Sequence, residues 1–148
     1  MNLDKYPLEA DSKCMLFEFE SNGSNGIIKK VIQYAPMESK GIYNLGFGDL
    51  DISTGEINDS VVSNNGDTYK ILATVASTVL IFLDKRPKSS IYIIGSNPIR
   101  TRLYRIGISN NLIEIESSFD VFGLIDSEWE LFQQQKNYEA FLIRNKKL

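Results

Sequence analysis

The stretch TYKILATVASTVLIFLDKR, residues 68–86, decides the fold of this 148-residue chain. Apolar side chains recur along it with the three- and four-residue spacing of an α-helix. Asp67 is a residue type that favours the helix N-cap, and Pro87 stops a helix. We therefore predict a long helix with one broad apolar face, formed by Ile71, Leu72, Val75, Val79, Phe82 and Leu83.

The opposite side of this helix carries only small, uncharged residues. A helix with so little charge along its middle is covered on most of its sides. The small side suits close packing against another helix, so a homodimer formed through it is one expectation. These residues are Ala73, Thr74, Ser77 and Thr78.

Four short strand-like segments precede the helix and predict an antiparallel β-meander. The segments are 14–20, 27–35, 42–52 and 57–63, and turn-forming residues separate them.

After the helix, the pattern predicts a strand over 89–96 and a short arginine-rich helix over 97–108. Asn97 is placed to cap that helix and Pro98 to begin it. Two C-terminal strands are predicted, over 119–125 and 138–144, whereas 128–132 is ambiguous. The predicted fold is α+β in a single domain, 1–148.

Composition limits the chemistry that the chain can perform. Sixteen basic and nineteen acidic side chains give a net charge of −3, whereas a polyanion binder is usually basic. The absence of histidine excludes catalytic triads that need it, and one cysteine, Cys14, cannot build a zinc site. We predict neither a metal nor a cofactor.

The single cysteine also favours a cytoplasmic protein. The longest apolar run, 71–83, is interrupted by threonine and serine and is shorter than the roughly 20 residues that span a bilayer. No membrane association is therefore expected.

The stretch GSNPIRTRLYRI, residues 95–106, is the main candidate site. Arg102 and Arg105 are three positions apart on the helix, so they are neighbours that could hold a carboxylate or phosphate together. The free N–H groups at the helix start also attract anions. The candidate ligand-binding residues are Ser96, Asn97, Arg100, Arg102, Tyr104 and Arg105.

The alternative is that these arginines only solvate the helix or pair with acids of the same chain, such as Glu114 and Glu116. In either case Ile99, Leu103 and Ile106 lie on one stripe, which we expect to be buried against the sheet.

Two weaker candidates lie upstream. The loop before the long helix, Asn64, Asn65, Gly66 and Asp67, is a second place where an anion could meet a helix start. Asp49 and Asp51 fall on one face of a strand and could hold Mg²⁺. No nuclease or kinase motif surrounds them, so we interpret both as surface acids near a turn.

Five stretches carry a resemblance to a known family: FEFESNGSNGIIKKVIQY, YNLGFGD, VVSNNGDTYKILATVASTV, GSNPIRTRLYRIGI and YEAFLIR. On these the chain resembles small bacterial proteins of about this length that are classed as a domain of unknown function. The resemblance implies a self-contained cytoplasmic domain and assigns no residue a role. The order of four strands and a helix is also similar to the unit of Pur-type and Whirly-type nucleic-acid binders.

Three functions remain open. A binding module would engage a protein partner or nucleic acid through the arginine-rich helix. An enzyme acting on RNA or a nucleotide, such as the toxin of a toxin–antitoxin pair, would have to use arginine, tyrosine and carboxylates. An antitoxin-like or immunity-like partner protein would benefit from an acidic surface. No residue spacing demands catalysis, so catalytic residues stay unknown and the binding module is the leading hypothesis.

Overall fold

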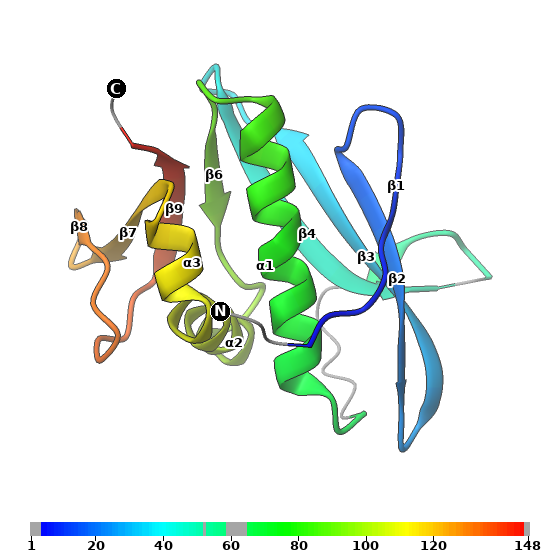
Figure 1. The fold of residues 1–148 in the computed structure, drawn as a ribbon. Coiled ribbons are helices and arrows are strands. Elements are labelled where there is room, and N and C mark those ends of the chain that lie inside the picture. The colour runs from blue at the N-terminus through cyan, green and yellow to red at the C-terminus, as the bar shows by residue number, and fades with distance from the viewer. Residues whose placement is uncertain (1–3, 52, 59–64, 147–148) are drawn as a thin grey trace.

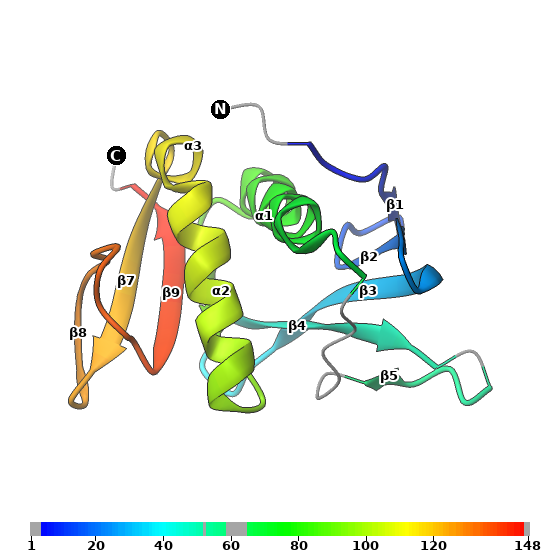
Figure 2. The same cartoon turned by 90° about the horizontal axis from the view of Figure 1, so that it is seen from below.

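A computed structural model of the chain describes residues 4–51, 53–58 and 65–146. In these residues nine strands form one mixed sheet, ordered β1-β2-β3-β4-β6-β9-β7-β8, with β5 paired to β4. The sheet curves around the helices, which all lie on the same side of it (Figures 1 and 2). The predicted α+β class is confirmed.

The meander is confirmed for its first three strands. β2 (Leu16–Gly23), β3 (Gly26–Pro36) and β4 (Ile42–Leu50) pair antiparallel in chain order. The fourth, β5 (Ile57–Asn58), pairs with β4 over two residues, and the remainder of the predicted segment, from 59 on, lies outside the described residues. An unpredicted edge strand, β1 (Glu9–Ala10), pairs with β2.

Helix α1 (Thr68–Lys85) is buried along most of its length, as its composition predicted. Phe82 is fully buried and stacks on Tyr34 of β3, with 4.2 Å between the ring centroids. The Tyr34 hydroxyl and the Thr78 Oγ1 lie 2.8 Å apart in a buried hydrogen bond. This contact fixes the helix on the centre of the meander.

Most of the small-residue side of α1 is covered by the chain itself, which leaves a second copy little surface to pack against there. Thr74 is fully buried, and its Oγ1 accepts a hydrogen bond from the backbone N–H of Tyr6 at 2.9 Å. On the other flank α2 crosses α1 at Gly107, where a Cβ would lie 3.3 Å from the Leu72 side chain.

The chain then returns to the sheet. β6 (Ser90–Ile93) lies parallel to β4, so α1 is the crossover between them. Helix α2 (Pro98–Asn110) and the short α3 (Leu112–Glu116) follow. The last strands are β7 (Phe119–Ile125), β8 (Glu128–Leu131) and β9 (Ala140–Asn145), and β9 inserts between β6 and β7. The ambiguous 128–132 segment is thus mostly a strand.

Among the described residues, no helix combines the length and the apolar character that crossing a membrane requires.

Gly123 of β7 tests this packing. A Cβ added there would collide with the ring of Tyr138, which is buried. We expect Gly123→Ala to lower the free energy of unfolding by about 1–3 kcal/mol, the usual cost of overpacking. The matched control is Gly46→Ala in β4, where the new Cβ would make an ordinary 3.6 Å contact with the Gln33 carbonyl oxygen. Urea unfolding of both variants gives the comparison, and equal losses would contradict the prediction.

Candidate functional site

An open groove of about 850 Å³ runs along helix α2. Its walls are the first turns of α2, the end of β6 and the segment that leads into β9. Three of the predicted residues line it together: Asn97, Arg102 and Arg105. The structure therefore brings the two adjacent arginines to one concavity.

The two arginines are in different states. Arg102 is exposed, whereas Arg105 is half-buried and its Nη1 donates a hydrogen bond to the Gln134 carbonyl oxygen at 3.1 Å. The Nε of Arg105 is buried and has no hydrogen-bond partner in the part of the chain that the structure describes. In that part, neither arginine has a carboxylate oxygen within 4.0 Å, so pairing with internal acids such as Glu114 is not observed.

Arg100 and Tyr104 do not line the groove, because they lie on the buried face of α2. Arg100 is 5% exposed, and its Nη2 donates a hydrogen bond to the Phe47 carbonyl oxygen of β4. The predicted buried stripe is wrong in part, since Ile99 is 65% exposed. The residues that α2 buries are Arg100, Tyr104, Gly107 and Ile108.

The start of α2 offers few free backbone N–H groups that could bind an anion. Asn97 caps it as predicted, because its side-chain oxygen accepts from the Arg100 N–H at 2.9 Å. The Thr101 N–H donates to the Asn97 carbonyl oxygen at 3.1 Å, and Pro98 has no N–H. Ser96 is exposed outside the groove lining. Side chains, more than the helix terminus, would therefore attract an anion here.

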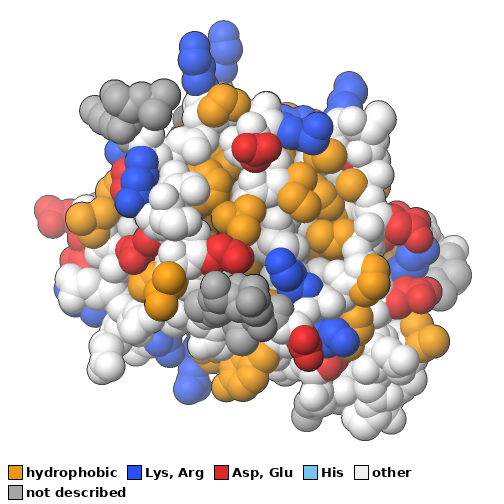
Figure 3. Space-filling model, viewed as in Figure 1, with side chains coloured by type: hydrophobic (Ala, Val, Ile, Leu, Met, Phe, Trp, Pro, Cys, Tyr) orange, Lys and Arg blue, Asp and Glu red, His pale blue; other side chains and the backbone are white. Residues whose placement is uncertain are grey.

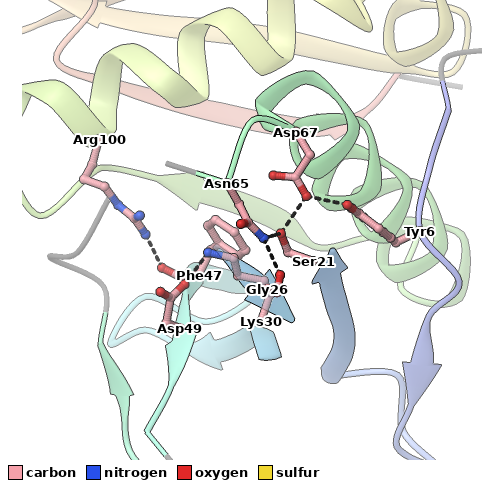
Figure 4. Close-up of polar contacts among 9 residues, drawn as sticks. All are labelled: Tyr6, Ser21, Gly26, Lys30, Phe47, Asp49, Asn65, Asp67 and Arg100. Atoms are coloured by element: carbon pink, nitrogen blue, oxygen red, sulfur yellow. Dashed lines mark hydrogen bonds and ion pairs between the residues drawn. The ribbon is translucent and has the colours of Figure 1, made fainter. Parts of the chain in front are cut away.

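Apart from the groove, polar contacts link the strands of the meander to α2, to the start of α1 and to the N-terminal segment (Figure 4). The interpretation of Asp49 as a surface acid is wrong: it pairs with Lys30, directly across from it in the β3–β4 register. Lys30 is 3% exposed. Asp51 is exposed, and its Oδ1 accepts from the backbone N–H and the hydroxyl of Ser53.

Asp67 occupies the N-cap position of α1 but does not cap the helix, which corrects the sequence prediction. Its Oδ2 instead accepts hydrogen bonds from the hydroxyls of Tyr6 and of Ser21, the latter at 2.6 Å. Asn65 is also turned inward, donating from Nδ2 to the Ser21 Oγ at 2.9 Å and to the Gly26 carbonyl oxygen at 3.0 Å. These contacts tie the N-terminal segment and the β2–β3 hairpin to α1.

The loop before α1 is a poor place for an anion. Gly66 adopts the left-handed conformation, with φ of 77°, and shares a shallow open pocket with Asp67. Asp4 and Lys70 line the same pocket, so two acidic residues and one lysine border it and no net positive charge gathers there to favour an anion. Asn64 lies outside the described residues. Among the residues that are described, no cluster of three His, Cys, Asp or Glu side chains could hold a metal ion.

Sequence reasoning missed the opposite wall of the groove, which includes Ile94, Asn137 and Glu139. These residues belong to the end of β6 and the approach to β9, which come together only because β9 inserts beside β6. No local pattern signals that pairing, since 43 other residues lie between Ile94 and Tyr138.

A family comparison covers nearly the whole chain. The model of a family of unknown function, DUF6934, matches residues 2–146. The chain belongs to this family. The predicted resemblance to a domain of unknown function is thereby confirmed, and the DUF6934 description assigns no residue a role. No curated protein and no solved structure shows significant similarity to the chain.

Replacing Asp67 with serine tests whether its side chain stabilises the fold through Tyr6 and Ser21 or through helix capping. Serine caps helices well, but it is too short to reach both Tyr6 and Ser21. Because the carboxylate accepts two hydroxyl hydrogen bonds in the structure, we expect Asp67→Ser to lower the free energy of unfolding by about 1.5–3 kcal/mol. Unchanged stability in chemical denaturation would contradict the stabilising role of these two hydrogen bonds.

The same network predicts a pH dependence. Burial, followed by the hydrogen bond to Asp67, raises the pKa of the Tyr6 hydroxyl above its ordinary value of 10.0. The folded state therefore favours neutral Tyr6, so its stabilising contribution is complete below pH 10.0 and declines as the pH rises further. Unfolding of the wild type and of Tyr6→Phe at neutral and alkaline pH measures this. The stability difference between them should shrink above pH 10.0, and a constant difference would contradict the assignment.

Proposed function

We propose that this member of the DUF6934 family is a non-enzymatic binding module whose groove takes an acidic group of a protein partner. One observation carries the proposal: Arg102 and Arg105 line the same open groove, and no described acid pairs with either. Two guanidinium groups side by side match the two oxygens of a carboxylate, so the groove has the chemistry to hold one.

The two arginines have different roles in this proposal. Arg105 is anchored by its bond to the Gln134 carbonyl, which holds its guanidinium in place before a ligand arrives. Holding a side chain in advance lowers the entropy that binding would otherwise cost. Arg102 has no described hydrogen bond and is exposed, so it is free to close on the ligand from the outer side.

Several features favour a protein over a nucleic acid. The chain carries a net charge of −3, and Glu139 lines the groove wall opposite the arginines, where it would repel a run of successive phosphates more than a single acidic group. On the face that carries the helices, acidic and basic side chains are interspersed (Figure 3). Exposed apolar residues adjoin the site, Ile94 in the groove at 44% and Ile99 on α2 at 65%. Arginine combined with apolar contact is typical of protein interfaces.

A cytoplasmic location belongs to the same proposal. It is supported by the single cysteine, Cys14, which is free in the structure.

Arg102→Gln tests the binding proposal, because Arg102 makes no described contact that the fold needs. The probe is a capped peptide of alternating glutamate and leucine, and the measurement is the shift of the arginine Nε–Hε NMR signals during titration. We expect the Arg102 and Arg105 signals to move in the wild type. Since a hydrogen bond to a charged group contributes about 1.5–3 kcal/mol, Arg102→Gln should weaken binding by roughly 10- to 100-fold.

The matched control is Lys88→Gln, which removes an exposed cation from the turn between α1 and β6 and should leave binding unchanged. A single-stranded uridine oligonucleotide is titrated in parallel. Salt-sensitive binding of the oligonucleotide at the same arginines, without peptide binding, would replace the protein partner by a nucleic acid. If neither probe moves the arginine signals, the proposal is overturned.

A further inference from the structure

The sheet face turned away from the helices carries a row of apolar side chains. Directly paired residues of neighbouring strands point to the same side of a sheet. In the register, Tyr92 of β6 pairs with Leu142 of β9, Leu142 with Phe122 of β7, and Phe122 with Leu131 of β8. Their neighbours along the strands, such as Ile91, Val121 and Ile143, are buried under the helices. The row of Tyr92, Leu142, Phe122 and Leu131, which we call the outer row, therefore faces outward.

This face is more apolar than a surface strand usually is. Leu131 is 64% exposed and Trp129, its neighbour on β8, is 43% exposed. The Trp129 and Tyr92 rings meet edge to face, with 6.2 Å between centroids, although they start from β8 and β6 with two strands between them. The two rings thus reach toward each other across the outer side of β7 and β9 and form one aromatic pair there. Exposed apolar surface of this kind marks an interaction site.

One acid and one base border the outer row. Asp120 of β7 lies directly opposite Arg144 of β9 in the register, yet they form no ion pair, because the Arg144 guanidinium lies over the Phe122 ring, 4.8 Å from its centroid. In the described residues neither charge has an oppositely charged partner within 4.0 Å. Asp120 is therefore available for pairing with another molecule, whereas Arg144 would exchange its contact with the Phe122 ring for such a pair.

We propose that a second copy of this chain packs on the outer face, related by a two-fold axis that runs parallel to the strands between β9 and β7. Such an axis exchanges β7 with β9 and β8 with β6 of the other copy, because the strand order is β6-β9-β7-β8. It places Phe122 against Leu142 of the second copy and Leu131 against Tyr92. It also places Asp120 against Arg144, twice.

This self-complementarity is the reason to choose a second copy over another partner. A two-fold interface must match its own patch, with residue i against j and j against i. Here apolar residues meet apolar residues, and each of the two charges meets its opposite. An unrelated partner would not require the outer row to be symmetric about the β9–β7 boundary. The interface is separate from the groove arginines and does not depend on the proposed function.

Charge exchange tests the proposal with the full-length protein. Sedimentation equilibrium should show a dimer for the wild type. Asp120→Arg gives a chain with two cations at the axis, and Arg144→Asp gives one with two anions. Each variant alone should dimerise at least about tenfold more weakly, because like charges then face each other. An equimolar mixture of the two should regain the wild-type association, since every facing pair is again opposite in charge.

Glu20→Arg, an equal charge reversal at an exposed position of β2, should leave the dimer unchanged, and Leu131→Lys should disrupt it. Circular dichroism checks that each variant is folded. The mixture tests the charge pairing across the interface even if one variant is less stable than the wild type. A monomeric wild type would overturn the proposal. So would dimers that persist in both single variants, or a mixture that stays monomeric.

Discussion

Burial of helix α1 is the constraint on which the rest of the structure depends. The helix has little polar surface to leave in water: Thr74 and Thr78 on its small side are as fully buried as Phe82 and Leu83 on its apolar side. A sheet alone covers only one side of a helix, so the chain must supply further cover. The N-terminal segment reaches Thr74 through the backbone of Tyr6, and α2 crosses at Gly107. The positions of both elements thus follow from the composition of α1.

Covering α1 also brings charged side chains inside. In the first turn of α2, the Arg100 guanidinium lies over the Phe47 ring and donates a hydrogen bond to the Phe47 carbonyl oxygen. Nearby, Lys30 pairs with Asp49. A buried charge is tolerated only when it is paired or hydrogen-bonded. These groups therefore stabilise the fold, whereas Arg102 and Arg105 lie on the outward side of α2. The division between structural and available arginines is a consequence of how α2 meets the sheet.

The sequence was informative wherever the signal is local. The long helix, the strands of the meander and β7 follow from periodicity and turn residues, and Asn97 caps α2 as its residue type predicts. It was misleading where tertiary contacts decide. Hydropathy favours burying Ile99, yet the fold buries Arg100, because an acceptor 53 positions away satisfies its guanidinium. Asp67 forgoes capping for the same reason: Tyr6 and Ser21 are distant in sequence and close in space. The insertion of β9 beside β6, which builds one wall of the groove, has no local signature.

The groove and the outer face are joined by the same two strands. β9 begins just after Glu139, which lines the groove, and carries Leu142 and Arg144 to the outer face. β6 holds Tyr92 in the outer row, and Ile94 follows two residues later in the groove, a step of roughly 7 Å along an extended chain. The proposed dimer would therefore hold two grooves at fixed, symmetric positions close to its interface. Two grooves on one rigid body favour a partner that offers two acidic segments, because the second contact would form at high effective concentration. Affinity of a single groove for an isolated acidic group could then be modest without making the module ineffective.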